Sequence, residues 1–189
     1  SRAEYRILLR QDDADMRLTE RSYRLGLASQ ERYDHLCLKR EKINEIIALT
    51  KAFSIKPALI NGTLESLGTT PLAHGCKLID LIGRPQITLA NMSEVIRPLG
   101  ALIGDITERK EEIVEAAEIK IKYQGYIERE KMIADKMQRL ESIKIRGRFN
   151  YNELQSLSTE ARQKLTKIDP ETLAQASRIP GVSPCQKHW

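Results

Sequence analysis

The chain has 189 residues, enough to bury one hydrophobic core, or one core with a small appendage. Aromatic residues make up 5% of the sequence and charged residues 30%, which is typical of an extended helical protein and argues against a β-sandwich or a β-barrel. The net charge of +5 is compatible with a polyanionic partner without indicating one, and no apolar run approaches the ~20 residues of a membrane span.

The start of the chain places arginines among acidic side chains. The arginines are Arg2, Arg6, Arg10 and Arg17. If residues 3–10 form a helix, Arg6 and Arg10 share one face. Arginine suits bidentate contacts with phosphate, so one interpretation is contact with a nucleic-acid backbone. The other is internal pairing with the neighbouring aspartates, and the sequence leaves both open. The opening residues also lack an initiating Met and the apolar core of a signal peptide, so we expect a piece of a longer chain.

Two helices are predicted on either side of Gly26. Thr19 is expected to begin a short helix that ends at Gly26, and Ser29 is expected to cap a longer helix over residues 30–51. The longer helix has an apolar face made of Tyr33, Leu36, Cys37, Ile43, Ile46 and Ile47. Its cations are expected largely on the polar side: Lys39, Arg40 and Lys42.

The middle of the chain is predicted to contain two short helices joined by loops. Turn-forming residues are frequent at its start: Pro57, Asn61, Gly62, Gly68 and Pro71. We therefore predict a loop over residues 53–71. A buried helix is expected over residues 77–82, and a second helix, capped by Thr88, is expected to end before Pro98. Residues 99–104 are expected to be a connection.

The three cysteines are odd in number and widely spaced, which favours reduced thiols in a cytoplasmic protein. Two His-x-Cys pairs, His35 with Cys37 and His74 with Cys76, contain donors of the kind that a tetrahedral zinc site uses. Positions two apart on a helix point to nearly opposite sides, however, so His35 and Cys37 would not share a metal ion. We predict no metal site.

A long polar run without proline follows. Asp105 with Glu108 has the spacing of a helix start, and one long helix is predicted over residues 105–141. Its apolar stripe consists of Ile113, Ala117, Ile121, Ile133, Met137 and Leu140.

The centre of this helix contains a glycine between two tyrosines: Tyr123, Gly125 and Tyr126. Glycine inside a helix costs roughly 1 kcal/mol relative to alanine, and it allows another backbone, a base or a helix to come close. Close helix packing and a partner-facing surface both remain open for this segment.

After the long helix, three cations, Lys144, Arg146 and Arg148, lie beside a glycine and an aromatic residue, Gly147 and Phe149. They are interpreted either as a phosphate contact or as loop cations favoured by the helix dipole. Ser158 is expected to cap a helix over residues 159–167, and Asp169 another over residues 171–178. With the glycine turn that follows, this segment resembles half of a helix-hairpin-helix, whose turn amides can hold a phosphate.

These patterns predict an all-α protein: a long central helix, packed shorter helices and a small C-terminal helical subdomain. The domains are expected to be residues 1–148 and residues 149–189. The sequence shows no glycine fingerprint for a dinucleotide and no Ser-His-Asp or Cys-His arrangement. We therefore assign no catalytic residue, and an independent helical enzyme has little support.

Several motifs occur in a fixed order: Ser1-Arg-Ala-Glu-Tyr-Arg6, Leu9-Arg10, Arg17-Leu-Thr19, Leu25-Gly-Leu27, Lys122-Tyr-x-Gly-Tyr-Ile127, Leu157-Ser158, Leu165, Gln175-Ala-Ser-Arg178 and Gly181-Val. With them, the sequence resembles the C-terminal region of the GidA/MnmG family from residue 1 to about residue 184. Members of this family install a 5-carboxymethylaminomethyl group on the wobble uridine of tRNA. Two departures stand out. Asp13 replaces the family's usual asparagine, and the residues after Pro184 do not continue into a last apolar helix, so we expect the terminal subdomain to lack that helix.

The resemblance implies a division of labour. In the longer protein, an upstream domain would bind FAD, use NADH and form the homodimer, and the protein would be a cytoplasmic enzyme that works with the tRNA-modification GTPase MnmE. The region present here would dock the GTPase and contact the anticodon stem-loop of tRNA, with no catalysis and no cofactor of its own. A protein–protein scaffold without RNA contact is the alternative.

These roles lead to three sets of candidate residues. For RNA contact or the seam with the upstream domain they are Arg2, Arg6, Arg10, Arg17, Lys144, Arg146 and Arg148. For close packing or a partner face they are Tyr123, Gly125 and Tyr126. For docking of the GTPase they are Leu157, Leu165, Gln175, Arg178 and Gly181.

Overall fold

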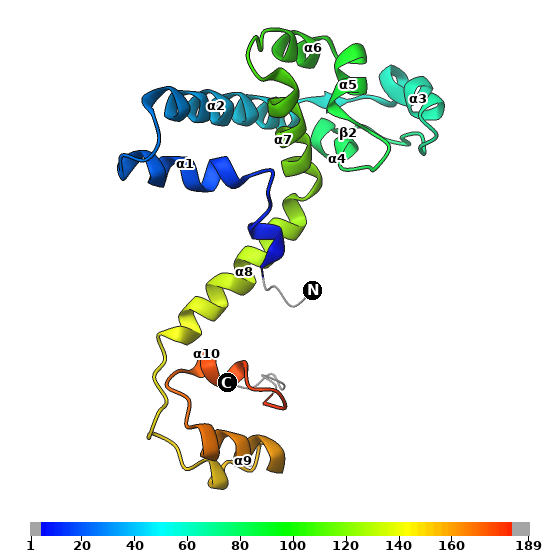
Figure 1. Ribbon diagram of the computed structural model, residues 1–189. Coiled ribbons are helices and arrows are strands. Elements are labelled where there is room, and N and C mark those ends of the chain that lie inside the picture. Colours follow the sequence, from blue (N-terminus) through cyan, green and yellow to red (C-terminus); the bar gives the residue numbers. More distant parts are fainter. Residues whose placement is uncertain (1–4, 183–189) are drawn as a thin grey trace. The chain divides into compact units, whose positions relative to one another are not determined.

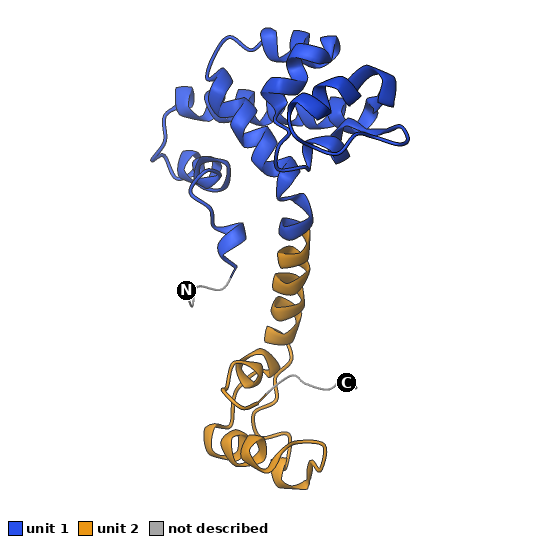
Figure 2. Cartoon of the chain, turned by 90° about the vertical axis from the view of Figure 1, so that its right-hand side faces the viewer, with its two compact units in different colours: residues 1–127 blue, residues 128–189 orange. Residues whose placement is uncertain are grey.

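The computed structural model describes residues 5–182 of the chain. Within them the protein is helical apart from loops and one two-stranded sheet (Figure 1), which confirms the predicted all-α class. The contacts divide the chain into two compact units, residues 1–127 and residues 128–189 (Figure 2). The boundary predicted between residues 148 and 149 lies inside the second unit. None of the described helices combines the length and the apolar character that crossing a membrane requires.

The first unit begins with a short 3-10 helix, η1 (Arg6–Leu8), and continues with α1 (Ala14–Arg24) and α2 (Gln30–Ala52). The next elements are β1 (Ser54–Ile55), α3 (Pro57–Ser66), β2 (Cys76–Lys77), α4 (Leu78–Ile82), α5 (Leu89–Val95), α6 (Arg97–Gly104) and α7 (Lys110–Lys122). The two strands pair antiparallel, with Ser54 opposite Lys77.

Helix α2 forms one wall of the core of the first unit and contacts α1, α4, α6 and α7. Its buried positions recur every three or four residues, as the predicted helix requires: Leu36, Lys39, Ile43, Ile46 and Thr50. The spacing therefore places Lys39 on the buried face. The prediction that Lys39 lies on the polar side is wrong, because the period of the helix, and not the charge of the residue, decides which face a position occupies.

Three predicted helix starts are confirmed by their caps. The Ser29 hydroxyl accepts a hydrogen bond from the Arg32 amide at 3.3 Å at the start of α2. Thr88 and Asn91 form a reciprocal capping box at the start of α5. The Ser158 hydroxyl accepts from the Ala161 amide at 3.2 Å. The predicted short buried helix is present as α4.

Other predictions were wrong in the N-terminal half of the chain. Helix α1 begins at Ala14, five positions before Thr19, and Thr19 is itself buried within it. The segment predicted as a loop contains α3, with Pro57 in its first turn. Ile60 and Leu64 of α3 lie one helical turn apart and are fully buried, so burial outweighs the turn preference of the intervening asparagine and glycine.

The predicted start of the long helix was also wrong. Residues 99–104 belong to α6, whose Leu99 and Ile103 enter the core, and Asp105 closes that helix by donating its amide to the Ala101 carbonyl at 3.0 Å. Ile106 is buried in the loop that follows, and α7 begins only at Lys110. The Asp–Glu spacing that suggested a helix start thus spans a helix end and a loop.

The long helix consists of α7 and α8 (Gln124–Glu141), separated by Tyr123 alone. The hydrogen-bond ladder continues across this residue, because the Tyr123 amide donates to Ile119 and the Ile127 amide donates to Tyr123, each at 2.9 Å. The interruption is therefore local. It occurs two residues before Gly125, where the sequence pattern also changes.

The second unit contains the remainder of α8, η2 (Tyr151–Glu153), α9 (Thr159–Ile168) and α10 (Leu173–Ser177). An isolated antiparallel bridge joins Lys144 to Thr172. The small core of this unit comprises Ile145, Tyr151, Ala161, Leu165, Ala176 and Val182. Asp169 does not cap α10 as predicted. It ends α9 in a left-handed conformation with φ 43°, and Thr172 caps α10.

Candidate nucleic-acid interface

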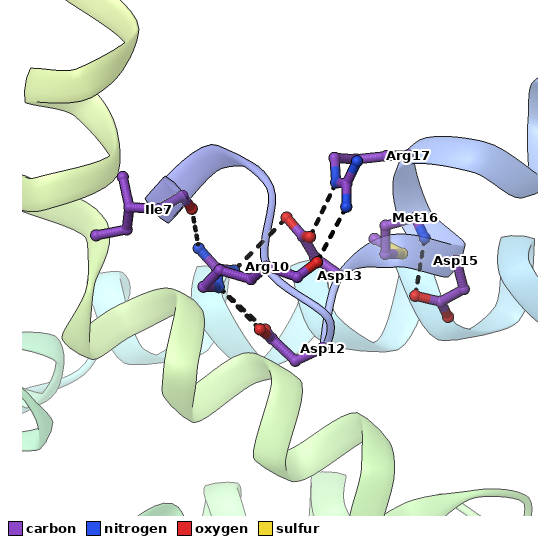
Figure 3. A network of polar contacts seen from close by, with 7 residues as sticks. All are labelled: Ile7, Arg10, Asp12, Asp13, Asp15, Met16 and Arg17. Carbon is purple, nitrogen blue, oxygen red and sulfur yellow. Dashed lines mark hydrogen bonds and ion pairs between the residues drawn. The ribbon is translucent and has the colours of Figure 1, made fainter. Parts of the chain in front are cut away.

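Arg10 and Arg17 hold the turn between η1 and α1 (Figure 3). Arg10 Nε donates to the Asp12 carboxylate at 2.9 Å, and Arg10 Nη1 donates to the carbonyl of Ile7 at 2.9 Å. Arg17 donates to the Asp13 carboxylate and to the carbonyl of Arg10, each at 3.0 Å. The internal pairing that the sequence left open is therefore present for both arginines.

This pairing limits what Arg10 and Arg17 offer a phosphate. Their side chains are only 20% and 32% exposed, so an incoming phosphate would compete with carboxylates already in place. Arg6 is exposed on η1, and Arg2 lies outside the described residues. Near the start of the chain, Arg6 is therefore exposed, whereas Arg10 and Arg17 are partly buried and paired within the fold.

An ion triad around the buried Lys39, which sequence reasoning missed, joins three helices. Lys39 Nζ of α2 lies 2.8 Å from an Asp15 oxygen of α1 and 2.7 Å from a Glu112 oxygen of α7. Burial by itself lowers the pKa of Lys39, but the hydrogen bonds to Asp15 and Glu112 outweigh it and hold the pKa above its ordinary value. The lysine therefore stays charged inside the unit.

The triad lies at a polar cleft of about 1040 Å³ between α1, α2 and α7. His35 projects into the same region and lies 3.5 Å from Glu108 and 3.7 Å from Glu31. The residues that line the cleft carry charges of both signs. It therefore presents no uniform positive surface to a nucleic acid.

The tyrosines beside Gly125 are exposed. Tyr123 and Tyr126 are 45% and 59% exposed, and their rings lie 6.2 Å apart at a tilt of 51°. A Cβ built on Gly125 would meet no atom within 4 Å. Within the described chain, Gly125 therefore provides no close helix packing, and the partner-facing interpretation of this segment stays a prediction.

The basic loop, residues 144–149, lies in the second unit. Lys144, Arg146 and Arg148 are all exposed, whereas Ile145 between them is 5% exposed and belongs to the core. Arg146 Nε donates to the carbonyl of Asp169 at 3.1 Å. Most of the chain's positive excess falls in this region: residues 142–189 contain eight Lys and Arg against four Asp and Glu, a net +4 of the total +5.

Phe149 completes the basic loop and was not among the predicted site residues. It follows Arg148 directly and is 49% exposed. The signal was present in the sequence, since an aromatic residue next to a run of cations is a common feature of surfaces that bind single-stranded nucleic acid.

The five residues predicted to dock a partner have different environments. Leu165 is 4% exposed in the core of the second unit, and Leu157 packs against the same core. These leucines would therefore contribute to docking by stabilising the unit, and not by contacting the partner. Gln175 is exposed, and its side-chain oxygen accepts from the Glu171 amide at 2.9 Å.

The other two predicted docking residues are exposed. Arg178 forms an ion pair of 2.9 Å with Glu141. Gly181 has φ +86°, and a Cβ there would lie 2.7 Å from a Glu160 oxygen. A left-handed backbone conformation favours glycine, so the turn itself explains why position 181 is a glycine.

The candidate zinc donors that the structure describes are not gathered into a metal site. No group of three or more His, Cys, Asp or Glu side chains suited to a metal ion occurs among residues 5–182. Cys37 is exposed and Cys76 is half-buried, and burial raises the pKa of the Cys76 thiol, which disfavours the thiolate that a metal would bind. Cys185 lies outside the described residues.

Comparison with known proteins assigns both parts of the chain to one family. Residues 30–131 match the family model described as the tRNA modifying enzyme MnmG/GidA C-terminal helical domain. Residues 133–186 match the model described as the MnmG/GidA C-terminal helical bundle.

Curated relatives and solved structures agree with these models. The chain is 71% identical over 184 residues to the tRNA uridine 5-carboxymethylaminomethyl modification enzyme MnmG of Phocaeicola vulgatus, covering 97% of this chain and 30% of the relative. It is 69% identical to the enzyme of the same name from Bacteroides fragilis, with the same coverage. Aquifex aeolicus GidA, in its form II crystal, is similar with a TM-score of 0.59 and 30% identity over 97% of this chain and 27% of that one.

The chain spans about a third of the length of these relatives, and the models that it matches describe their C-terminal helical parts. Both the sequence identity and the helical fold support the same assignment. The chain therefore belongs to the MnmG/GidA family of tRNA-modifying enzymes, of which it is the C-terminal helical domain.

Proposed function

We propose that this helical domain serves the uridine-modifying enzyme by docking its GTPase partner, MnmE, and by holding part of the tRNA anticodon stem-loop. The observation that carries the RNA contact is the concentration of positive charge in residues 142–189, together with the exposure of the basic loop. Contacts with phosphates supply most of the affinity of sequence-independent nucleic-acid binding, and they need exposed cations on one surface.

The chemistry of the modification belongs elsewhere in the longer protein. We propose that FAD and NADH act in the part of the enzyme that this chain does not contain, in the cytoplasm, and that the homodimer is formed there. Hydride and one-carbon transfer depend on the cofactor, while the protein positions it. This domain would contribute binding, and we assign it no catalytic residue.

A scaffold that binds only the GTPase is the second candidate. The pairing of Arg10 and Arg17 with aspartates favours it, because these arginines are occupied within the fold. In this case the tRNA would be held by the rest of the enzyme and by the GTPase, and the basic loop would be a solvated surface.

Fluorescence anisotropy with a labelled anticodon stem-loop separates the two candidates. The full chain is titrated into the RNA at two salt concentrations, with and without the GTPase. Binding by the chain alone that weakens with salt, by about 0.7 to 0.9 in logarithmic slope per phosphate contact, would support the RNA-binding function. Binding of the GTPase without any binding of RNA would support the scaffold.

A further inference from the structure

We propose that the basic loop binds an unpaired segment of RNA, with the Phe149 ring stacked on a base and with Lys144 and Arg148 in contact with the flanking phosphates. This inference rests on the proposed RNA-binding function. It specifies which part of the RNA is bound and which side chains bind it.

The basic loop is held in one conformation by its neighbours. The Ile145 amide donates to the carbonyl of Glu171 at 2.9 Å, and the Leu173 amide donates to the carbonyl of Ile143 at 3.0 Å. The Gly147 amide donates to the Asp169 carboxylate at 3.3 Å. Because the loop is already ordered, binding through it would cost little conformational entropy.

The three cations of the basic loop are exposed, but they differ in whether they are paired. Ile145 is buried, so the side chains of Lys144 and Arg146 on either side of it point away from the core, and Arg148 is exposed in the turn that follows. Arg146 is tied to the Asp169 carbonyl, whereas Lys144 and Arg148 form no ion pair with any residue between 5 and 182. These two side chains are the cations of the loop that a phosphate can reach without displacing a partner.

Phe149 decides what kind of ligand fits. The chain contains only two phenylalanines, and this one leaves 49% of its surface exposed beside Arg148. An exposed aromatic ring next to cations is the combination that binds single-stranded nucleic acid, where unpaired bases stack on rings while cations follow the backbone. Bases in a duplex are already stacked within the helix, so the loop should prefer unpaired RNA.

An acidic protein segment would be a different ligand. It would satisfy Lys144 and Arg148 but would offer no planar group to the Phe149 ring. Binding of such a segment should therefore not depend on the ring, whereas an RNA base stacked on the ring should be bound more weakly by both Phe149→Ala and Phe149→Leu, because leucine keeps an apolar contact and loses the flat ring.

The test measures anisotropy of two labelled RNAs with the full chain: the anticodon stem-loop and a fully paired duplex. Both Phe149→Ala and Phe149→Leu should weaken binding of the stem-loop about five-fold or more, the range reported for loss of base stacking, with little change for the duplex. Lys144→Ala with Arg148→Ala should lower the logarithmic salt slope by about 1.4, or about 0.7 per contact on a single strand. Ile168→Ala, at a side chain that is 51% exposed in the same unit, is the matched control and should change neither value.

Several results would overturn the inference. If Phe149→Leu binds the stem-loop like the unchanged chain while Phe149→Ala does not, the contact is apolar and not stacking. If the Phe149 variants no longer bind the GTPase but bind the stem-loop as the unchanged chain does, the surface belongs to a protein partner. If the unchanged chain binds the stem-loop and every variant of the loop binds it equally well, the inference fails and the proposed RNA-binding function stands. If the unchanged chain does not bind the stem-loop at all, both fail.

Discussion

Lys39 Nζ lies 2.7 Å from Glu112 Oε1 although only 3% of the lysine side chain is exposed. With Asp15 on its other side, the ammonium group joins the consecutive helices α1 and α2 to α7, which is far from both in the sequence. The cost of burying a charge is large, and paired carboxylates offset it only when both are in place. The triad therefore makes the position of α1 depend on the residues that neutralise Lys39.

Removing the negative charges of the triad should destabilise the first unit. We expect Asp15→Asn with Glu112→Gln to lower the free energy of unfolding by about 3 kcal/mol, because a buried ammonium group would lose its counter-charges. Chemical denaturation at neutral pH measures this value. Glu45→Gln is the control, since it removes the partner of Lys42 at the same 2.8 Å distance but at a more exposed site, where a much smaller loss is expected. Equal losses in the two variants would contradict the special role of burial.

The triad should also contribute a defined pH dependence. The pKa of Lys39 is higher in the folded protein than in the unfolded chain. Its contribution to stability is therefore complete below about pH 10.4, the ordinary lysine value, and is lost as the pH rises through the folded pKa. We expect the difference in unfolding free energy between the unchanged chain and Lys39→Met to be constant near neutral pH and to shrink above about pH 10.4. A difference that grew with pH would show the opposite sign of the shift.

The sequence predicted the helices whose starts contain a capping residue, such as those after Ser29 and Ser158. It failed where local preference and burial disagree. Asn61-Gly62 is a strong turn signal, but the side chain of Asn61 instead bonds both the carbonyl and the amide of Leu72, at 3.1 and 2.8 Å. These contacts connect positions 11 residues apart, and no local pattern contains them.

The candidate site was predicted in part for a similar reason. The cations of the basic loop are exposed, as a binding role requires, because their spacing around buried Ile145 is a local pattern. The sequence could not predict whether Arg10 is paired within the fold or available to a phosphate. A guanidinium group close to aspartates in the sequence is compatible with both. Only the geometry of the turn after η1, where Arg10 also bonds the carbonyl of Ile7, distinguishes them.

Gly100 should not tolerate a side chain. A Cβ there would lie 2.5 Å from the carbonyl oxygen of Ser93, where the backbones of α5 and α6 come close. We expect Gly100→Ala to lower the free energy of unfolding by roughly 1 to 3 kcal/mol through overpacking. In Gly104→Ala, at the end of the same helix, the new Cβ meets nothing within 4 Å, so this variant should be neutral or stabilising by up to about 1 kcal/mol. Thermal denaturation of the pair compares them, and similar melting temperatures would contradict the close approach.

Gly125 should behave differently in folding and in binding. Alanine meets no atom there, and it favours a helix, so Gly125→Ala should raise the stability of the chain by up to about 1 kcal/mol. If a partner's backbone packs closely against the helix at Gly125, the same change should weaken binding of that partner, because the added methyl group would occupy the space that the glycine leaves open. Calorimetric titration with the GTPase and with the anticodon stem-loop measures the second effect. Greater stability with unchanged binding of both partners would remove the partner-facing role.

Arg6 and Arg10, both predicted to contact RNA or the upstream domain, should have separate effects. Arg10 bonds Asp12 and the carbonyl of Ile7, so Arg10→Ala should lower the free energy of unfolding by about 1 kcal/mol, as expected for hydrogen bonds at a partly exposed site, and should leave the salt slope of RNA binding unchanged. Arg6 is exposed on η1, so Arg6→Ala should leave stability unchanged and, if it contacts a phosphate, lower the logarithmic salt slope by about 0.7 to 0.9. Anisotropy at several salt concentrations and chemical denaturation of each variant give the four values. A lower slope in Arg10→Ala would show that RNA displaces the aspartates, and an unchanged slope in both would confine RNA contact to other parts of the chain.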